Sequence, residues 1–134
     1  VLLDEFEAFC LSMGNPHAVI FMQNLDELES LNLNVVGPRL EKNINFPEFT
    51  NIEFACVLED KTIRMRVWER GVGVTMACGS GACATLVAAF KINKSSKSNK
   101  IILDGGSLFV EWLNNGNVTL SGDTEKVYEG LIGG

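Results

Sequence analysis

Residues 81–90 have the sequence Gly-Ala-Cys-Ala-Thr-Leu-Val-Ala-Ala-Phe, which is apolar around nearly the whole circumference of a helix. Small residues and good helix formers dominate this stretch, and a helix that is apolar on all sides is typical of a buried position. We therefore expect a central helix over residues 80–91, with the other elements packed around it. Cys83 lies within this run and is expected to be a core thiol.

A hairpin is expected just before this helix. Apolar side chains occupy alternate positions in residues 52–58 and again in residues 63–67, and the turn 59–61 separates the two runs. Such alternation is typical of strands with one apolar face, and it places Arg64 and Arg66 on the opposite face of the second strand.

A second hairpin is expected after the helix. Strands over residues 107–113 and 117–121 flank Asn114-Asn115-Gly116, a turn sequence that tolerates positive φ. The predicted fold class is therefore α+β, with a mixed, mostly antiparallel sheet curled around the central helix. Other expected elements are strands at 5–11, 18–22 and 125–128, a short surface helix at 26–31, a loop-rich connection around Gly37-Pro38 and Phe46-Pro47, and a solvated lysine-rich loop at 91–100.

The composition indicates one domain spanning residues 1–134. Of the 134 residues 46% are hydrophobic and 21% are charged, which is typical of a folded globular core. The net charge of −6 argues against a nucleic-acid partner, because such partners are bound largely through their phosphates. No apolar stretch approaches the roughly 20 residues needed to cross a membrane, and no signal peptide is visible. The absence of an initiator Met suggests a fragment or a processed chain.

The chain contains four cysteines. Cys10 and Cys56 lie in apolar, strand-like runs and are expected to be core thiols. A chain of this size and apolar content does not require disulfides, so we expect reduced cysteines and a cytoplasmic location. A zinc site is not expected, because the sequence has a single His and no pair of cysteines spaced as C-x2-C.

Residues 68–84 contain the most informative pattern for function. A strand ends in Glu69 and Arg70, and a glycine-rich segment then places Cys78 directly before the central helix. The first turn of a helix has free N–H groups and a partial positive charge, which favour a docked carboxylate and lower the pKa of a nearby thiol. A thiolate in that place is suited to removing the proton from the α-carbon of an amino acid.

The segment Glu69-Arg-Gly-x-Gly-x-Thr-x-Ala-Cys-Gly-Ser-Gly-Ala82 resembles the signature of the diaminopimelate epimerase family, cofactor-independent enzymes of bacterial lysine biosynthesis. Residues 13–19 (Met-Gly-Asn-Pro-His-Ala-Val) resemble a second motif of that family, and residues 46–54 (Phe-Pro-Glu-Phe-Thr-Asn-Ile-Glu-Phe) resemble a third. Residues 105–108 and 120–122 match more loosely. The resemblance implies that the chain is the C-terminal half of a two-domain epimerase, without the N-terminal half that carries the other catalytic cysteine.

The resemblance also implies roles for individual residues. Cys78 matches the catalytic thiol of this half, and Glu69 matches the carboxylate that contacts substrate and tunes that thiol. His17 matches the imidazole that tunes the thiol of the missing half. Gly79 and Ser80 match the backbone that binds the carboxylate at the reacting centre.

A further set matches positions that hold the distal amino-acid end of the substrate: Asn15, Asn51 and Arg70. The implied reaction interconverts LL- and meso-diaminopimelate by proton transfer between two cysteines. No cofactor and no metal are expected, because no lysine or ligand cluster is placed for either. The expected partners are the amino-acid substrate, the missing N-terminal domain and a second copy in a homodimer, with no membrane. Without its other half the isolated chain is expected to be inactive.

Other interpretations of these residues remain open. The family commonly has Glu at the position of Val74, which weakens the assignment of the substrate. Another amino-acid racemase of the same superfamily, acting on histidine or proline, is one alternative, although Asn15, Asn51 and Arg70 favour a polar distal end over proline. A non-catalytic module for ligand binding or dimerisation is another. Taken singly, His17 is explained by a satisfied loop histidine, Glu69 and Arg70 by a surface ion pair, and the two asparagines by turns.

Overall fold

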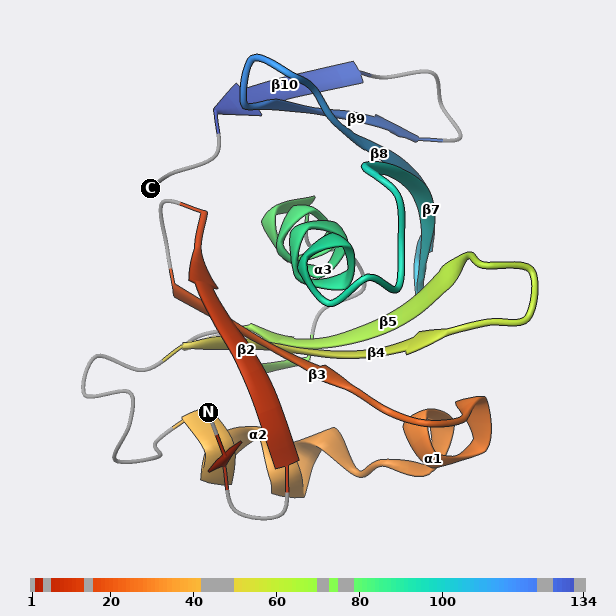
Figure 1. Cartoon of the computed structure of the whole chain (residues 1–134). Coiled ribbons are helices and arrows are strands. Elements are labelled where there is room, and N and C mark those ends of the chain that lie inside the picture. Colours follow the sequence, from red (N-terminus) through yellow and green to blue (C-terminus); the bar gives the residue numbers. More distant parts are fainter. Residues whose placement is uncertain are drawn as a thin grey trace.

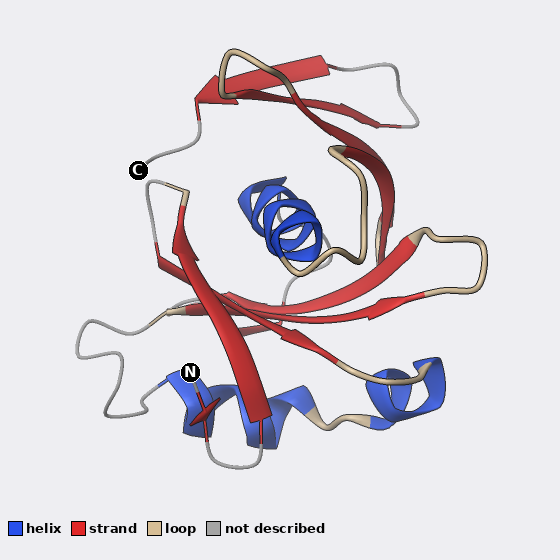
Figure 2. Cartoon of the chain, viewed as in Figure 1, coloured by secondary structure: helices blue, strands red, loops and turns tan. Residues whose placement is uncertain are grey.

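The computed structural model describes most of the chain. Outside the described part lie residues 1, 4–5, 14–15, 42–49, 70–72, 75–78, 123–126 and 132–134. Within the described part, two helices follow the first three strands, and a third helix separates the next three strands from the last four (Figure 2). The helices are α1 (Leu25–Ser30), α2 (Leu33–Glu41) and α3 (Gly79–Lys91).

The described strands join into one sheet of ten strands (Figure 1). Its order is β1-β2-β3-β4-β5-β7-β8-β9-β10, and β6 pairs with β5. The pairs β3–β4 and β5–β7 are parallel and the others are antiparallel, so the expectation of a mixed, mostly antiparallel sheet is confirmed. The strands are β1 (Leu2–Leu3), β2 (Phe6–Ser12), β3 (Pro16–Phe21), β4 (Asn51–Val57), β5 (Ile63–Glu69), β6 (Gly73–Val74), β7 (Ser98–Leu103), β8 (Gly106–Trp112), β9 (Asn117–Gly122) and β10 (Val127–Leu131).

The expected apolar helix is α3, and every residue from Gly81 to Ala89 in it is buried. It contacts strands from both parts of the sheet, β2 to β5 on one side and β7 and β8 on another (Figure 1). Small side chains such as Ala84 and Ala88 allow close approach to the sheet, where Val19 belongs to the same buried cluster. With 13 residues α3 is also too short to cross a membrane, and no other helix in the described part of the chain is long and apolar enough to do so.

The predicted hairpin at 52–67 is the antiparallel pair β4–β5, with Cα partners from Ile52–Trp68 to Val57–Ile63. Arg64 and Arg66 lie on the face away from α3, as expected. Arg66 donates from Nη1 to the carbonyls of Leu28 and Leu31, each at 2.9 Å, and so ties α1 to this face of the sheet. Helices therefore cover both faces of the hairpin, and all residues from Asn51 to Cys56 are buried.

One prediction was wrong about the connection that follows α1. The Gly37-Pro38 pair was expected to lie in a loop-rich connection, but both residues lie inside α2. Asn32 supports the start of this helix, since its side chain accepts a bond from the N–H of Asn34 at 3.2 Å. Gly37 does not form a turn. It allows α2 to pack closely against Trp68, because a Cβ at Gly37 would lie 2.2 Å from the Trp68 ring. The predicted short surface helix at 26–31 is α1, which begins one residue earlier.

The lysine-rich region also differs from its prediction. A solvated loop was expected over residues 91–100, but β7 begins at Ser98. The first residues of this strand are polar, so the sequence pattern does not indicate a strand there. Its later residues Ile101 and Leu103 are buried in the core. The second hairpin is confirmed as β8–β9, with Gly116 at φ +90° in its turn. The strand expected at 125–128 corresponds to β10, which starts at Val127, and residues 125–126 lie outside the described part.

The expectation that Cys10 is a core thiol was wrong. Cys10 is exposed, whereas Cys56 and Cys83 are buried as expected. Cys10 lies on β2, near the edge of the sheet, and β1 pairs with Phe6 and Glu7 of that strand and not with Cys10. The alternation of apolar residues in β2 does not reveal this position near the edge.

Candidate functional site

Of the residues singled out by the sequence, His17, Asn51 and Glu69 lie at one end of three adjacent strands. His17 is the second residue of β3, and its Cα partner in the parallel register is Asn51, the first residue of β4. The backbone of Glu69, which ends β5, lies one residue beyond the Trp68–Ile52 pair and so lies next to Asn51. Three separate motifs of the sequence thus meet on adjacent strands.

A buried acid and base lie within this group. The His17 Nδ1 atom is 2.8 Å from Oε2 of Glu53, and both side chains are 0% exposed. Asn51 and Thr50 beside them are also buried. A carboxylate bonded to one ring nitrogen favours one tautomer of an imidazole, in which the other nitrogen is the basic one. The pair can therefore support acid–base chemistry.

Sequence reasoning gave no role to Glu53, although the residue lies in the third motif. The alternation of Ile52, Phe54 and Cys56 indicates one apolar face, so Glu53 belongs by pattern to the polar face. A signal for its burial is that it is the single charged residue between Asn51 and Val57. Buried charges in such a run require a partner.

Helix α3 packs against β5, the strand that Glu69 ends. Thr85 of α3 donates to the Met65 sulfur of β5 at 3.1 Å. The first turn of a helix presents N–H groups that have no partner within the helix. Gly79 lies close to one side chain of β9, because a Cβ there would lie 3.3 Å from the Leu120 side chain.

Several predicted site residues lie outside the described residues: Cys78, Asn15 and Arg70. Cys78 directly precedes Gly79, the first residue of α3, and Arg70 directly follows Glu69. Asn15 directly precedes β3. The roles of these side chains and of Glu69 stay predictions.

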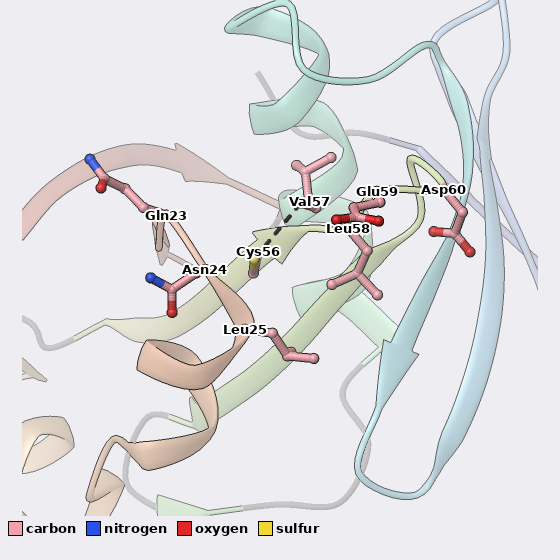
Figure 3. Close-up of a pocket in the computed structure, with 8 residues that line it drawn as sticks. All are labelled: Gln23, Asn24, Leu25, Cys56, Val57, Leu58, Glu59 and Asp60. Atoms are coloured by element: carbon pink, nitrogen blue, oxygen red, sulfur yellow. Dashed lines mark hydrogen bonds between the residues drawn. The ribbon is translucent and has the colours of Figure 1, made fainter.

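A cavity of about 560 Å³ lies elsewhere, at the far ends of β3 and β4 (Figure 3). The Cys56 thiol lines it and contacts the carbonyl of Val57 at 3.8 Å. Desolvation raises the pKa of this thiol, which keeps it protonated and unreactive at neutral pH. Cys56 also lies on the sheet face away from α3, so this cavity is not where the sequence motifs meet.

The comparisons with known proteins agree on one family. The family model described as diaminopimelate epimerase matches residues 9–127. A protein of Phocaeicola vulgatus named diaminopimelate epimerase is 47% identical over 129 residues, which are 96% of this chain and 45% of that protein. A protein of Parabacteroides distasonis with the same name is 50% identical over 123 residues, 91% of this chain and 45% of its own. The chain thus spans about 45% of the length of these curated relatives.

Solved structures agree on the fold. A phenazine biosynthesis protein of the PhzF family from Enterococcus faecalis superposes with a TM-score of 0.60 at 16% identity. The match covers 86% of this chain and 42% of that one. At this level of identity the similarity extends to the mixed sheet with its few helices and not to activity.

Proposed function

This chain belongs to the diaminopimelate epimerase family, and we propose that it is the C-terminal half of an enzyme that interconverts LL- and meso-diaminopimelate in lysine biosynthesis. The family match over residues 9–127 carries this proposal. In this proposal residues 1–134 form one domain whose sheet curls around α3, and the active site lies between this domain and the missing half. We also propose a cytoplasmic location, as the cysteine content of the sequence indicates.

The proposed reaction moves a proton from one face of the α-carbon to the other. The Cys78 thiolate removes the proton from one face, and the C–H electron pair stays on the α-carbon. The thiol of the other half delivers a proton to the opposite face, so that a new C–H bond replaces the broken one. The reverse direction exchanges the roles of the two thiols. The reaction needs no cofactor, because both proton carriers are side chains.

The other residues of the site assist this transfer. Gly79 and Ser80 at the start of α3 bind the carboxylate next to the reacting carbon, which helps to stabilise the carbanion. Glu69 contacts the substrate and tunes Cys78. The buried position of His17 and its bond to Glu53 support its role as the imidazole that tunes the second thiol.

The distal amino-acid end of the substrate is held by Asn15, Asn51 and Arg70 in this proposal. Asn51 supports it by its place next to His17 in the register of the sheet. A guanidinium binds a carboxylate with two parallel hydrogen bonds, which suits a second amino-acid group better than the ring of proline. These residues set the substrate, whereas Cys78 performs the chemistry.

The test uses a joined protein, in which this chain is linked to the part of the Phocaeicola vulgatus relative that it does not match. We expect this protein to exchange the α-proton of diaminopimelate for deuterium in heavy water and to interconvert the two isomers. Cys78→Ser should abolish both, because a hydroxyl is a far weaker base at neutral pH.

The matched control is Cys10→Ser, an exposed thiol that should leave the rate unchanged. Undiminished epimerisation by Cys78→Ser would contradict the proposed role of Cys78. Turnover of histidine in place of diaminopimelate would contradict the proposed substrate.

A further inference from the structure

Glu53 is an acidic residue in the middle of a strand that is buried on both faces. Its side chain is 0% exposed, and so are its neighbours Ile52 and Phe54. Removal of an ionised carboxylate from water costs several kcal/mol unless a partner compensates for it. A residue of this kind at this place therefore depends on the group that it contacts.

That group is His17 on the adjacent strand. The parallel register pairs His17 with Asn51 and Val19 with Glu53, so His17 and Glu53 are diagonal neighbours on the face of the sheet toward α3. The contact joins Nδ1 to Oε2 at 2.8 Å. Because both residues lie within paired strands, the backbone holds this contact in one geometry.

The contact determines which ring nitrogen carries a proton. An ionised Glu53 carboxylate has only acceptor atoms and therefore accepts from Nδ1–H. In the neutral ring Nε2 is then the basic nitrogen. A thiol that exchanges protons with His17 would have to do so at Nε2.

We infer that Glu53 is a positioning residue for His17, which holds the ring as the Nδ1–H tautomer and directs its proton exchange to Nε2. The inference rests on the proposed function, in which His17 tunes the thiol of the other half. It extends that function to a residue that does not contact the substrate. A purely structural ion pair makes a different prediction, because such pairs are often replaced by apolar residues without loss.

The first experiment observes His17 directly. The chain contains one histidine, so the ring signals of a ¹⁵N-histidine-labelled 134-residue chain belong to His17 without further assignment. We expect a protonated, pyrrole-like Nδ1 in the natural chain. In Glu53→Met and Glu53→Leu, which remove the acceptor, the proton should move toward Nε2, the form that predominates for histidine in water. The control Glu59→Gln removes a charge from the exposed turn of the same hairpin and should leave the signals unchanged.

A bare Nδ1 in the natural chain would overturn the inference, and so would an unchanged tautomer in a folded Glu53 variant. Backbone amide spectra of the same samples establish that each variant is folded. If both variants unfold, the natural chain alone decides by the state of its Nδ1.

The second experiment measures catalysis in the joined protein. Glu53→Met should lower kcat for diaminopimelate about 10- to 100-fold, with KM nearly unchanged and an altered pH profile, as for loss of a group that orients an acid–base residue. In a His17→Ala background the same change should have little further effect, because the two act as one unit.

A Glu53→Met enzyme with natural kcat and pH profile would overturn the inference. An inactive joined protein with all natural residues would instead count against the proposed function, while the tautomer of His17 would still decide the role of Glu53.

Discussion

The thiols of this chain differ in solvent exposure and in pKa, the two properties that control the rate of alkylation. Cys10 is exposed, whereas Cys56 and Cys83 are buried. Desolvation nevertheless raises the pKa of the Cys10 thiol, and the same cause raises that of Cys56. Because the thiolate is the reactive form, exposure alone does not make Cys10 a good nucleophile at neutral pH.

We therefore expect iodoacetamide at neutral pH to label Cys78 faster than the other three thiols. The start of α3 favours a thiolate at Cys78. Peptide mapping after limited labelling measures the order, and labelling of the unfolded chain gives the intrinsic rates for comparison. Labelling of Cys10 and Cys56 should increase only as the pH rises above their ordinary pKa, because burial moves both upward. Equal labelling of all four thiols, or faster labelling of Cys10, would contradict a special environment at Cys78.

Arg70→Lys in the joined protein tests how the distal end of the substrate is held. Lysine keeps the charge but does not reproduce the two parallel hydrogen bonds of a guanidinium. We expect kcat/KM for diaminopimelate to fall by about 30- to 1,000-fold, or ~2–4 kcal/mol of transition-state binding, with residual turnover. The control is Arg39→Lys on the exposed surface of α2. Natural kcat/KM in Arg70→Lys would indicate a smaller or differently charged substrate.

For single residues, the sequence predicts the strand on which a residue lies better than it predicts whether the side chain is buried. His17 and Asn51 lie side by side because His17 is the second residue of β3, Asn51 is the first residue of β4, and the two strands pair. Alternation along β4 assigns Glu53 to a polar face, because this pattern does not reveal that helices cover both faces of the strand. The prediction that Cys10 is buried was wrong for the opposite reason. Its apolar neighbours in the sequence do not reveal that it lies near the edge of the sheet.

Among the elements, α2 shows why glycine and proline are poor markers of a break when read alone. The helix continues through Gly37 and Pro38, and its buried residues Leu33 and Leu40 lie on either side of them. The requirement for glycine at position 37 comes from a residue about thirty positions away in the sequence. The Trp68 ring occupies the space that a side chain at position 37 would need. Local sequence does not contain that information.

Gly37→Ala is therefore expected to destabilise the protein, although alanine is the better helix former. The added Cβ would lie 2.2 Å from the Trp68 ring, so backbone or ring must move. We expect a loss of ~1–3 kcal/mol in the free energy of unfolding, the range for overpacked sites, as measured by urea denaturation.

Two further variants make this prediction specific to the contact. Val35→Ala lies on the exposed side of the same helix, and its effect should stay within about 0.5 kcal/mol. Trp68→Leu should make the added methyl less harmful, so that the double variant is more stable than the sum of the single effects predicts. A neutral or stabilising Gly37→Ala would show that α2 moves away from the sheet without penalty.

The whole fold could be predicted in outline because its strongest signals are local. The apolar run of α3 and the two hairpins need only short-range patterns, and they already imply a mostly antiparallel sheet around a buried helix. The parallel pairs β3–β4 and β5–β7 could not be predicted this way, since each joins strands separated by helices and long connections. The site depends on these pairs, because β3–β4 brings His17 beside Asn51.

The chain by itself supplies one half of the proposed chemistry. Inversion at the α-carbon needs a proton acceptor on one face and a donor on the other, and Cys78 is the one thiol placed by the motifs for this purpose. Among the described residues, Cys56 lies on the sheet face away from α3 and Cys83 is buried within α3. We therefore expect the isolated chain to show no measurable exchange of the α-proton of diaminopimelate in heavy water, as followed by NMR or mass spectrometry. The joined protein, measured at the same concentration, is the positive control. Exchange by the isolated chain at a comparable rate would show that a second proton carrier lies within these 134 residues.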